Sequence, residues 1–504
     1  MVESEDWVTP RLYGQTWFEK PVLYYWGAAL SFKLFGVSEA TARLPSAIAA
    51  LLATLALAWL AWRIYGAETA GWLLFLLPTT VGMIGFSHAA ATDMPFAAML
   101  TIAMVCAAVV AGLTRDANTP ILPRTPWLAL LLFGFFLGLA VLAKGPAALI
   151  LSGGAVFLWA IFTVRWRDAF RLLHPVAIAA FGVTALPWLI ICARRNPDFV
   201  RIFFIEHNLR RYLTPEFQHV QPLWFYVPVL LVAFVPWTLA LLWSAEFGFR
   251  RERRGFRLSD ISIFLLTWTT FCVLFFSFSQ SKLPGYVLPS MPPTALILSR
   301  ACVYLAPLNA RPFRWIRFGF YFLALPVSIA LLCIRRNGVS ETHGQKMTSA
   351  AYILFLLGLT NLLLANKVSA NRFFRRTAPL CVVPVLVILA AFRPLAAPWL
   401  STDTSAKALA QSIGQLRPDL PPLSELFVLP ANRNMKYGLS FYLHTEIPSW
   451  DADHPQAGVI LFRSGSSKLD CENKLPLGWD CATPAVVLDS TGWMAYRVHT
   501  SNTP

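Results

Sequence analysis

The sequence is short of charge. Only 13% of its 504 residues are charged, whereas 57% are hydrophobic, and the mean hydropathy is +0.56. So few charged side chains could not cover the surfaces of several soluble domains. The composition therefore excludes a soluble multidomain protein and indicates a membrane protein.

Long uncharged runs recur from residue 44 onward, and twelve of them have the length needed to cross the hydrocarbon core of a bilayer. We therefore expect an all-α polytopic membrane domain of about twelve spans over residues 44–395. The candidate spans are 44–62, 70–92, 94–114, 125–143, 145–164, 175–193, 220–245, 261–281, 283–299, 318–334, 348–366 and 377–392.

The net charge of +16 does not point to nucleic acid, because the basic residues lie in short clusters between apolar runs. One set of alternate loops carries roughly twice as many Lys and Arg residues as the other, which by the positive-inside rule makes the first set cytoplasmic. The N-terminal segment 1–43, the opposite loops and the C-terminal segment 400–504 are then predicted to face the opposite compartment, which for a bacterial inner membrane would be the periplasm. The basic loops are 63–69, 115–124, 165–174, 246–260, 300–317 and 367–376.

The sequence also lacks a signal peptide, since residues 1–7 are acidic and are not followed by an apolar run of the required kind. Residues 1–43 contain no run long enough to span, although 21–32 suits a helix at the membrane interface. An exported segment without an export signal is a contradiction. We therefore hypothesise that Met1 is an internal methionine taken for the start, or that the gene is truncated.

Cysteine is scarce, and six of the eight cysteines lie in apolar runs, where a thiol behaves as a small hydrophobic group. Cys471 and Cys481 lie instead in a polar segment that the topology puts in an oxidising compartment. We predict a disulfide between them, with two free thiols as the alternative.

Residues 400–504 have soluble composition, and their helix-like and strand-like runs predict a small α/β periplasmic domain that ends in a hairpin around 490–492.

Several basic residues lie on the predicted periplasmic side, where the positive-inside rule would lead us to expect few. Lys20 follows Glu19 at the entrance to an aromatic run, and Lys144 and Lys282 lie at the outer ends of hairpins. Arg210 and Arg211 lie in the outer loop 194–219. Snorkelling would explain single lysines. Gathered together, however, such cations indicate an anionic ligand at the membrane surface, for example a lipid phosphate.

Asp93 joins the second and third predicted spans with almost no loop. A carboxylate there could simply cap the next helix, with Pro95 in its first turn. An ionisable group at the membrane face is nevertheless a functional candidate. Glu19, Glu206, His207 and His219 add possible metal ligands on the same face, but no pair has the spacing of a strong metal motif, and a structural hydrogen bond explains His207 equally well.

Several motifs in this order resemble a known family, the polyprenyl-phosphate-dependent membrane glycosyltransferases. The family includes the aminoarabinose transferases of lipid A and the protein mannosyltransferases. The resemblance runs from residue 5 to about 400, and 437–442 is similar to the family's outer C-terminal domain. The motifs are 6–14 (DWVTPRLYG), 18–21 (FEKP), 35–45 (FGVSEATARLP), 92–95 (TDMP), 143–146 (AKGP), 204–219 and 282–289 (KLPGYVLP).

The resemblance implies a C-type glycosyltransferase fold and transfer of a sugar from a polyprenyl phosphate, typically undecaprenyl phosphate, to a lipid, glycan or protein acceptor on the periplasmic side, with inversion. An acid must position or deprotonate the acceptor hydroxyl, and cations must offset the charge of the departing phosphate. By resemblance, Asp93 and Glu19 are catalytic candidates, Lys20 contacts the lipid phosphate, and Glu19 with His207 could hold a divalent, zinc-like metal. Further donor-binding candidates are Arg11, Lys144, Arg210, Lys282 and Tyr286.

The sequence departs from the family at its N-terminus. Family members usually begin with a transmembrane helix that ends in an acidic motif, whereas this sequence begins inside the motif that follows. Two other functions stay open at this point. A transporter or flippase of lipid-linked sugars would also have many spans, although it typically places its charges near mid-membrane. An inactive family member would bind polyprenyl phosphate without turnover.

Overall fold

The computed structural model describes residues 1–114, 126–215, 220–245 and 258–305, apart from 3, 13, 239 and 243. In the C-terminal part it describes 406–415, 422–429, 433–450, 456–463, 475–481 without 477, 486–487 and 493–500. The chain divides into two compact units. Residues 1–305 belong to the first unit and the described residues from 406 onward to the second.

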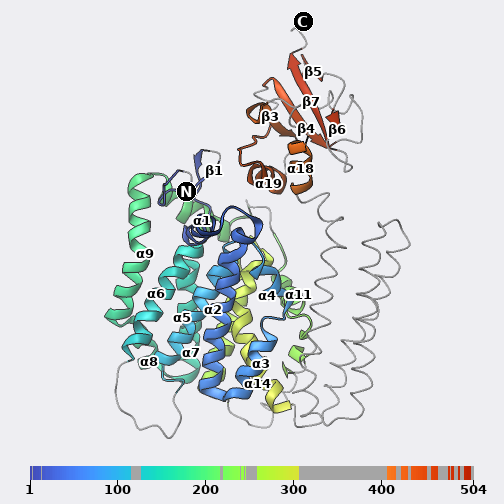
Figure 1. The fold of residues 1–504 in the computed structure, drawn as a ribbon. Helices are drawn as coiled ribbons and strands as arrows, with labels where there is room; N and C mark the ends of the chain where they lie inside the picture. Colours follow the sequence, from blue (N-terminus) through green and yellow to red (C-terminus); the bar gives the residue numbers. More distant parts are fainter. Residues whose placement is uncertain are drawn as a thin grey trace, which may run out of the picture. The chain divides into compact units, whose positions relative to one another are not determined.

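The first unit is a helical bundle preceded by a small hairpin of β1 (Arg11–Leu12) and β2 (Gln15–Thr16) (Figure 1). Its α-helices are α1 (Leu23–Phe35), α2 (Glu39–Tyr65), α3 (Ala67–Leu76), α4 (Val81–Ser87), α5 (Asp93–Val110), α6 (Trp127–Lys144), α7 (Ala147–Thr163), α8 (Trp166–Phe170), α9 (Pro175–Arg195), α10 (Arg211–Leu213), α11 (Tyr226–Ala233), α13 (Asp260–Ser277) and α14 (Met291–Leu305). Between them lie the 3₁₀ helices η1 (Arg171–Leu173), η4 (Leu223–Phe225) and η5 (Pro284–Ser290), and the π-helix η2 (Arg201–Arg210).

Helix α5 forms the centre of this bundle and is buried along almost its whole length, with α2 and α6 packed against it. Small residues let the outer helix α9 approach α6 closely. A Cβ atom at Gly134 would lie 2.0 Å from the Ala177 carbonyl oxygen, and one at Gly138 would lie 2.8 Å from Thr184 Cβ. This glycine pair has the four-residue spacing typical of close helix contacts in membranes.

The start of α2 shows how local sequence sets an element boundary. Ser38 accepts a hydrogen bond from the Thr41 amide, and the Thr41 hydroxyl accepts one from the Ser38 amide. The pair satisfies two amide donors that a helix start leaves without intrahelical partners. The helix therefore begins at Glu39, five residues before the apolar run that predicted it.

Five described helices, α2, α5, α6, α9 and α13, are long and apolar enough to cross a membrane, and the pair α3 and α4 makes a sixth if it is one bent span. The predicted span 70–92 is thus two helices at 63° to each other. Tertiary hydrogen bonds stabilise the break: Trp237 donates to the Thr79 hydroxyl at 2.9 Å, and the Val81 amide donates to the Val235 carbonyl at 2.8 Å.

Other predicted spans also differ in detail. Helix α7 has 17 residues, 220–245 includes only the short η4 and α11 among its named helices, and 283–299 is divided between η5 and α14. The predicted spans 318–334, 348–366 and 377–392 lie outside the described residues. A count of twelve spans therefore stays a prediction.

The second unit is an α/β assembly of α18 (Lys407–Gln415), η9 (Leu423–Glu425), α19 (Arg433–Leu443) and a mixed sheet of β3 (Leu426–Leu429), β4 (Gly458–Arg463), β5 (Trp479–Cys481), β6 (Val486–Val487) and β7 (Trp493–Thr500). The strand order is β3-β4-β7-β5, with β6 also paired to β7. Strands β3 and β4 are parallel, and the other pairs are antiparallel.

Hydrophobic packing joins the helices of the second unit to its sheet. Leu409 and Ile413 of α18 and Leu439 of α19 form one buried cluster with Val428 and Leu461 of the strands. The pairing of β6 with β7 is the hairpin that the sequence predicted, whereas α19 was not predicted. Cys481 is disulfide-bonded; Cys471, its predicted partner, lies outside the described residues.

Candidate active site

The N-terminal segment before α1 is fixed to α9 by hydrogen bonds. Trp188 donates to the Val8 carbonyl at 2.9 Å, and the Asn196 amide donates to the Thr9 hydroxyl at 3.0 Å. Asp6 accepts from the backbone amides of Val8 and Thr9. Burial opposes ionisation of Asp6, but these hydrogen bonds and the nearby Arg195 outweigh it and lower its pKa.

Apolar contacts then place the following Glu19 and Lys20. Phe18 is 3% exposed and Val22 is fully buried. The Phe18 ring lies edge-on to Phe199 with 5.2 Å between centroids. Because both flanking side chains are buried in one cluster with the residues after α9, the backbone of the pair has little freedom to move.

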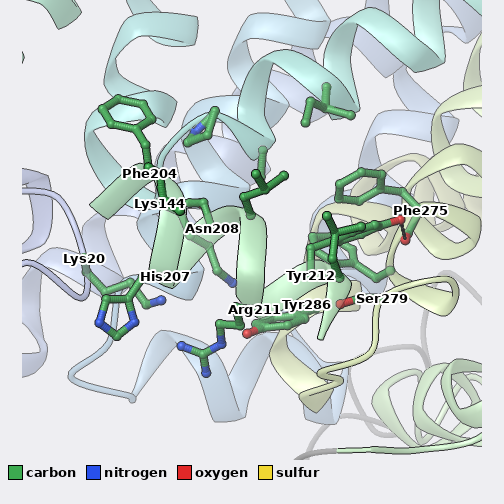
Figure 2. A pocket seen from close by; sticks show the side chains of 17 residues that line it. Lys20, Lys144, Phe204, His207, Asn208, Arg211, Tyr212, Phe275, Ser279 and Tyr286 are labelled. Atoms are coloured by element: carbon green, nitrogen blue, oxygen red, sulfur yellow. Dashed lines mark hydrogen bonds between the residues drawn. The ribbon is translucent and has the colours of Figure 1, made fainter. Parts of the chain in front are cut away.

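A cavity of about 560 Å³ lies beside this segment (Figure 2). In the figure, Lys20, His207 and Arg211 lie on one side of the cavity, and Tyr212, Phe275 and Ser279 lie on the other. The lining residues are Lys20, Lys144, Pro146, Ala147, Ile150, Phe204, Ile205, His207, Asn208, Leu209, Arg211, Tyr212, Leu213, Phe275, Phe276, Ser279 and Tyr286. A cationic end and an extensive apolar wall thus share one space.

Two predicted site residues that line this cavity, Lys144 and Tyr286, come from separate elements and meet there, and Asp93, which does not itself line the cavity, contacts Lys144 from a third element. Lys144, the last residue of α6, donates to Asp93 Oδ1 at 2.5 Å, and Asp93 is the first residue of α5. Lys144 Nζ also lies 4.4 Å from the centroid of the Tyr286 ring in η5. The Lys144 side chain is 8% exposed. A lysine so deeply buried requires a carboxylate close by, and Asp93 supplies it.

A glycine that the sequence analysis did not single out brings η5 against Asp93. A Cβ atom at Gly285 would lie 3.0 Å from Asp93 Oδ1 and 2.8 Å from the Phe86 ring. Any larger residue would press on the carboxylate. Gly285 is part of the motif KLPGYVLP at 282–289, but only the fold shows which residues lie against it.

Arg211 is the third cation that lines the cavity, after Lys20 and Lys144. It donates to Glu19 Oε1 at 3.3 Å, and the two side chains are 12% and 19% exposed. The neighbouring Arg210 is exposed and does not line the cavity. Arg210 is the last residue of the π-helix η2, and Arg211 is the first residue of α10. Consecutive residues of a helix point in different directions, so only one of the two side chains faces the cavity.

The electrostatics of the cavity favour an anion. Burial, together with the charges of Arg211 and Lys144, lowers the pKa of Lys20 to about 8, against the opposing effect of Glu19 and Asp93. Burial likewise lowers the pKa of His207, although the Glu19 carboxylate acts in the opposite direction. A bound anion would favour the protonated form of Lys20.

Two other predicted donor-binding residues lie elsewhere. Arg11 in β1 is exposed and donates to the Gly14 carbonyl at 3.3 Å. Lys282 is buried and donates to the Gln221 carbonyl at 2.8 Å. Neither lines the cavity. In this structure Lys282 ties the η5 loop to the segment before η4, which is a positioning arrangement.

The residues that the structure describes do not make a complete metal site. The described part of the chain holds no group of three or more His, Cys, Asp or Glu side chains that could bind a metal ion. Glu19 and His207 supply two donors at most, and the Arg211 guanidinium lies on the Glu19 carboxylate. A protein-held zinc normally has at least three protein ligands. His219 lies outside the described residues.

Comparisons with known proteins agree with this picture. The family model described as dolichyl-phosphate-mannose-protein mannosyltransferase matches residues 1–203. Undecaprenyl phosphate-alpha-4-amino-4-deoxy-L-arabinose arabinosyl transferases match more of the chain. The Aeromonas salmonicida protein is 28% identical over 94% of this chain and 89% of its own length. The Serratia proteamaculans protein is 34% identical over 59% of this chain and 52% of its own length.

Solved structures show the same fold. ArnT from Cupriavidus metallidurans, in a crystal structure bound to undecaprenyl phosphate, superposes with a TM-score of 0.74 over 98% of this chain and 91% of that chain, at 21% identity. The predicted resemblance is confirmed: in sequence and fold the chain is similar to the polyprenyl-phosphate-dependent membrane glycosyltransferases. Within that class, it resembles the aminoarabinose transferases over most of its length.

Proposed function

We propose that this chain transfers a sugar from a polyprenyl-phosphate donor to a lipid, glycan or protein acceptor. The observation that carries the proposal is the cavity, in which Lys20, Lys144 and Arg211 lie at one end of a largely apolar space. Such a space fits an amphiphile with an anionic head. The names of the matched relatives make undecaprenyl phosphate-linked 4-amino-4-deoxy-L-arabinose the first donor to test.

The donor's two chemical parts match two parts of the cavity. The phosphate lies among the three cations, which offset its charge, and Tyr286 borders them. The first isoprene units follow the apolar wall formed by Ile150, Ile205, Leu209, Leu213 and Phe275. The remaining tail stays in the bilayer, so the donor need not leave the membrane to react.

The reaction is a displacement at the anomeric carbon. The acceptor oxygen bonds to that carbon while the bond to the phosphate oxygen breaks, and the departing polyprenyl phosphate takes the electron pair. The acceptor proton passes to the Asp93 carboxylate, which Lys144 orients. Lys20 and Arg211 stabilise the charge that develops on the phosphate. Attack from the face opposite the leaving group inverts the anomeric configuration.

Glu19 acts in this scheme through Arg211. Its carboxylate holds the guanidinium at the cavity and balances part of the positive charge around Lys20. A divalent metal bound by Glu19 and His207 remains a separate proposal, and no step of the reaction depends on it. Displacement of Arg211 from Glu19 would be the first requirement for such a metal.

We also propose a membrane topology for the chain. The chain spans a bacterial inner membrane about twelve times, and the cavity and the 400–504 domain lie on its periplasmic side. Two observations support this. The described bundle contains five to six membrane-length helices, and the basic loops alternate with the segments that carry the site residues.

Purified protein in liposomes provides the test. The assay supplies the undecaprenyl-phosphate aminoarabinose donor and lipid A, and mass spectrometry measures modified lipid A. Lys20→Ala and Asp93→Asn should each strongly reduce transfer. Arg210→Ala is the matched control, because Arg210 is a neighbouring cation outside the cavity. Full transfer by both site variants would overturn the proposal, as would donor binding without turnover by the wild-type protein.

A further inference from the structure

A second cavity, of about 460 Å³, lies between α6, α7 and α9 and is bordered by α8 and η1. It shares no lining residue with the site cavity. It also lies toward the other end of α6, because Lys144 at the end of α6 lines the first cavity, whereas Phe133, Gly134 and Leu137 line the second. The ring contact of Trp127 with His174 places the start of α6 beside the start of α9.

The lining of this second cavity is almost wholly apolar. Aromatic and aliphatic side chains form most of it, with the Ser152 hydroxyl turned to its own helix, where it donates to the Ala148 carbonyl. Three of the large lining side chains remain accessible: Phe157 is 55% exposed, Phe170 is 64% and Leu173 is 63%. The volume falls within the range of about 300–1,000 Å³ usual for ligand pockets.

Basic side chains lie on the segment that borders the cavity. Helix α8 and η1 alternate apolar lining residues such as Phe170 and Leu172 with Arg167 and Arg171, both exposed. Arg171 shares Asp168 with Arg165, which also binds Asp260. Arginines at the rim of an apolar cavity match the two parts of an anionic phospholipid, which are a phosphate head and acyl chains.

We propose that this cavity binds an acyl chain of an anionic glycerophospholipid, with the headgroup phosphate at Arg167 and Arg171. A neutral amphiphile would gain only the apolar contacts, so charge sets the preference between lipids. The bound lipid fills space between α6, α7 and α9. It is separate from the donor cavity and is not consumed by transfer.

The first test fills the cavity. Gly153 lines it, and a Cβ atom there would meet nothing within 4 Å, so Gly153→Leu starts its side chain in open space at the cavity wall. Gly71→Leu on α3 is the control, because Gly71 has equally open surroundings and lines neither cavity. Delipidated protein in detergent receives dioleoyl phosphatidylglycerol, and native mass spectrometry counts retained lipid. Retention should fall in Gly153→Leu and not in Gly71→Leu.

The second test removes the headgroup contact. Arg167→Gln should weaken phosphatidylglycerol binding about fivefold, the usual effect of one basic residue at a lipid surface, and Arg167→Lys should retain most of it. Arg63→Gln, an exposed arginine at the end of α2, is the charge control. Dioleoyl phosphatidylcholine should bind more weakly than phosphatidylglycerol. Equal binding of the two lipids, or unchanged retention in Gly153→Leu, would overturn the proposal.

Discussion

Lys144 Nζ lies 2.5 Å from Asp93 Oδ1, and this contact joins the last residue of one buried helix to the first residue of another. A cation therefore lies directly on the carboxylate, and the cation in turn packs on the Tyr286 ring. An acceptor hydroxyl that approaches Asp93 meets an oriented carboxylate.

Asp93→Asn should lower the rate of sugar transfer by about 10²–10⁴, the usual contribution of a positioned acid or base. The amide keeps the shape of the carboxylate but cannot take the acceptor proton. Donor binding should persist, because the cavity cations remain. Radiolabelled transfer and equilibrium donor binding separate the two effects. An unchanged rate would exclude Asp93 as the proton acceptor.

Donor binding should weaken as pH rises through about 8. The folded protein lowers the pKa of Lys20 from 10.5 to that value, so the protonated form that attracts the phosphate is complete below it and is lost above it. Bound phosphate should itself move the transition upward. Titration of the dissociation constant from pH 6 to 10 measures it. Lys20→Arg should bind without this transition, since arginine stays charged; the same pH dependence in that variant would contradict the assignment.

The two neighbouring arginines should behave differently. Arg211→Gln removes a cavity cation and the partner of Glu19, so it should weaken donor binding by about 10-fold or more, in line with a charge-assisted hydrogen bond of roughly 1.5–3 kcal/mol. Arg210→Gln changes an exposed side chain and should stay within about twofold of wild type. Equal losses in both variants would contradict the assignment of Arg211, and not Arg210, to the donor cavity.

Gly285→Ala should damage the site without removing any of its polar groups. The added Cβ would lie 3.0 Å from Asp93 Oδ1 and 2.8 Å from Phe86, and overpacking of this kind costs about 1–3 kcal/mol. We expect lower transfer activity and a lower melting temperature. Gly85→Ala is the matched control, because a Cβ at that glycine in the adjacent α4 meets nothing within 4 Å. Comparable activity of the two variants would argue against a close approach at Gly285.

Sequence reasoning found most of the cavity's charged residues, because each stands in a short motif and the topology assigns those motifs to one face. Lys20, Lys144, His207 and Tyr286 all line the cavity, and Asp93 contacts Lys144. The sequence analysis named Arg210 as a donor-binding candidate, whereas in the structure Arg211 lines the cavity and Arg210 does not. The sequence could not identify the Gly285 contact, because Phe86 and Asp93 are distant in sequence.

The helix boundaries, like the site, could be predicted only in part from the sequence. Continuous apolar composition predicted a membrane-length segment at 70–92, but the break between α3 and α4 depends on hydrogen bonds from Trp237 and to Val235. Those partners are more than 150 positions away along the chain. Hydropathy predicts whether a segment can lie in the hydrocarbon core of a membrane. It does not predict which distant residues will form hydrogen bonds with the backbone of that segment.

The ion pair between Glu19 and Arg211 links two segments that lie outside the membrane-length helices and are 192 positions apart. The bundle supplies other parts of the cavity wall, through Lys144 of α6, Ile150 of α7 and Phe275 of α13. The donor cavity is therefore built jointly, and neither the membrane-length helices nor the two outer segments form it alone.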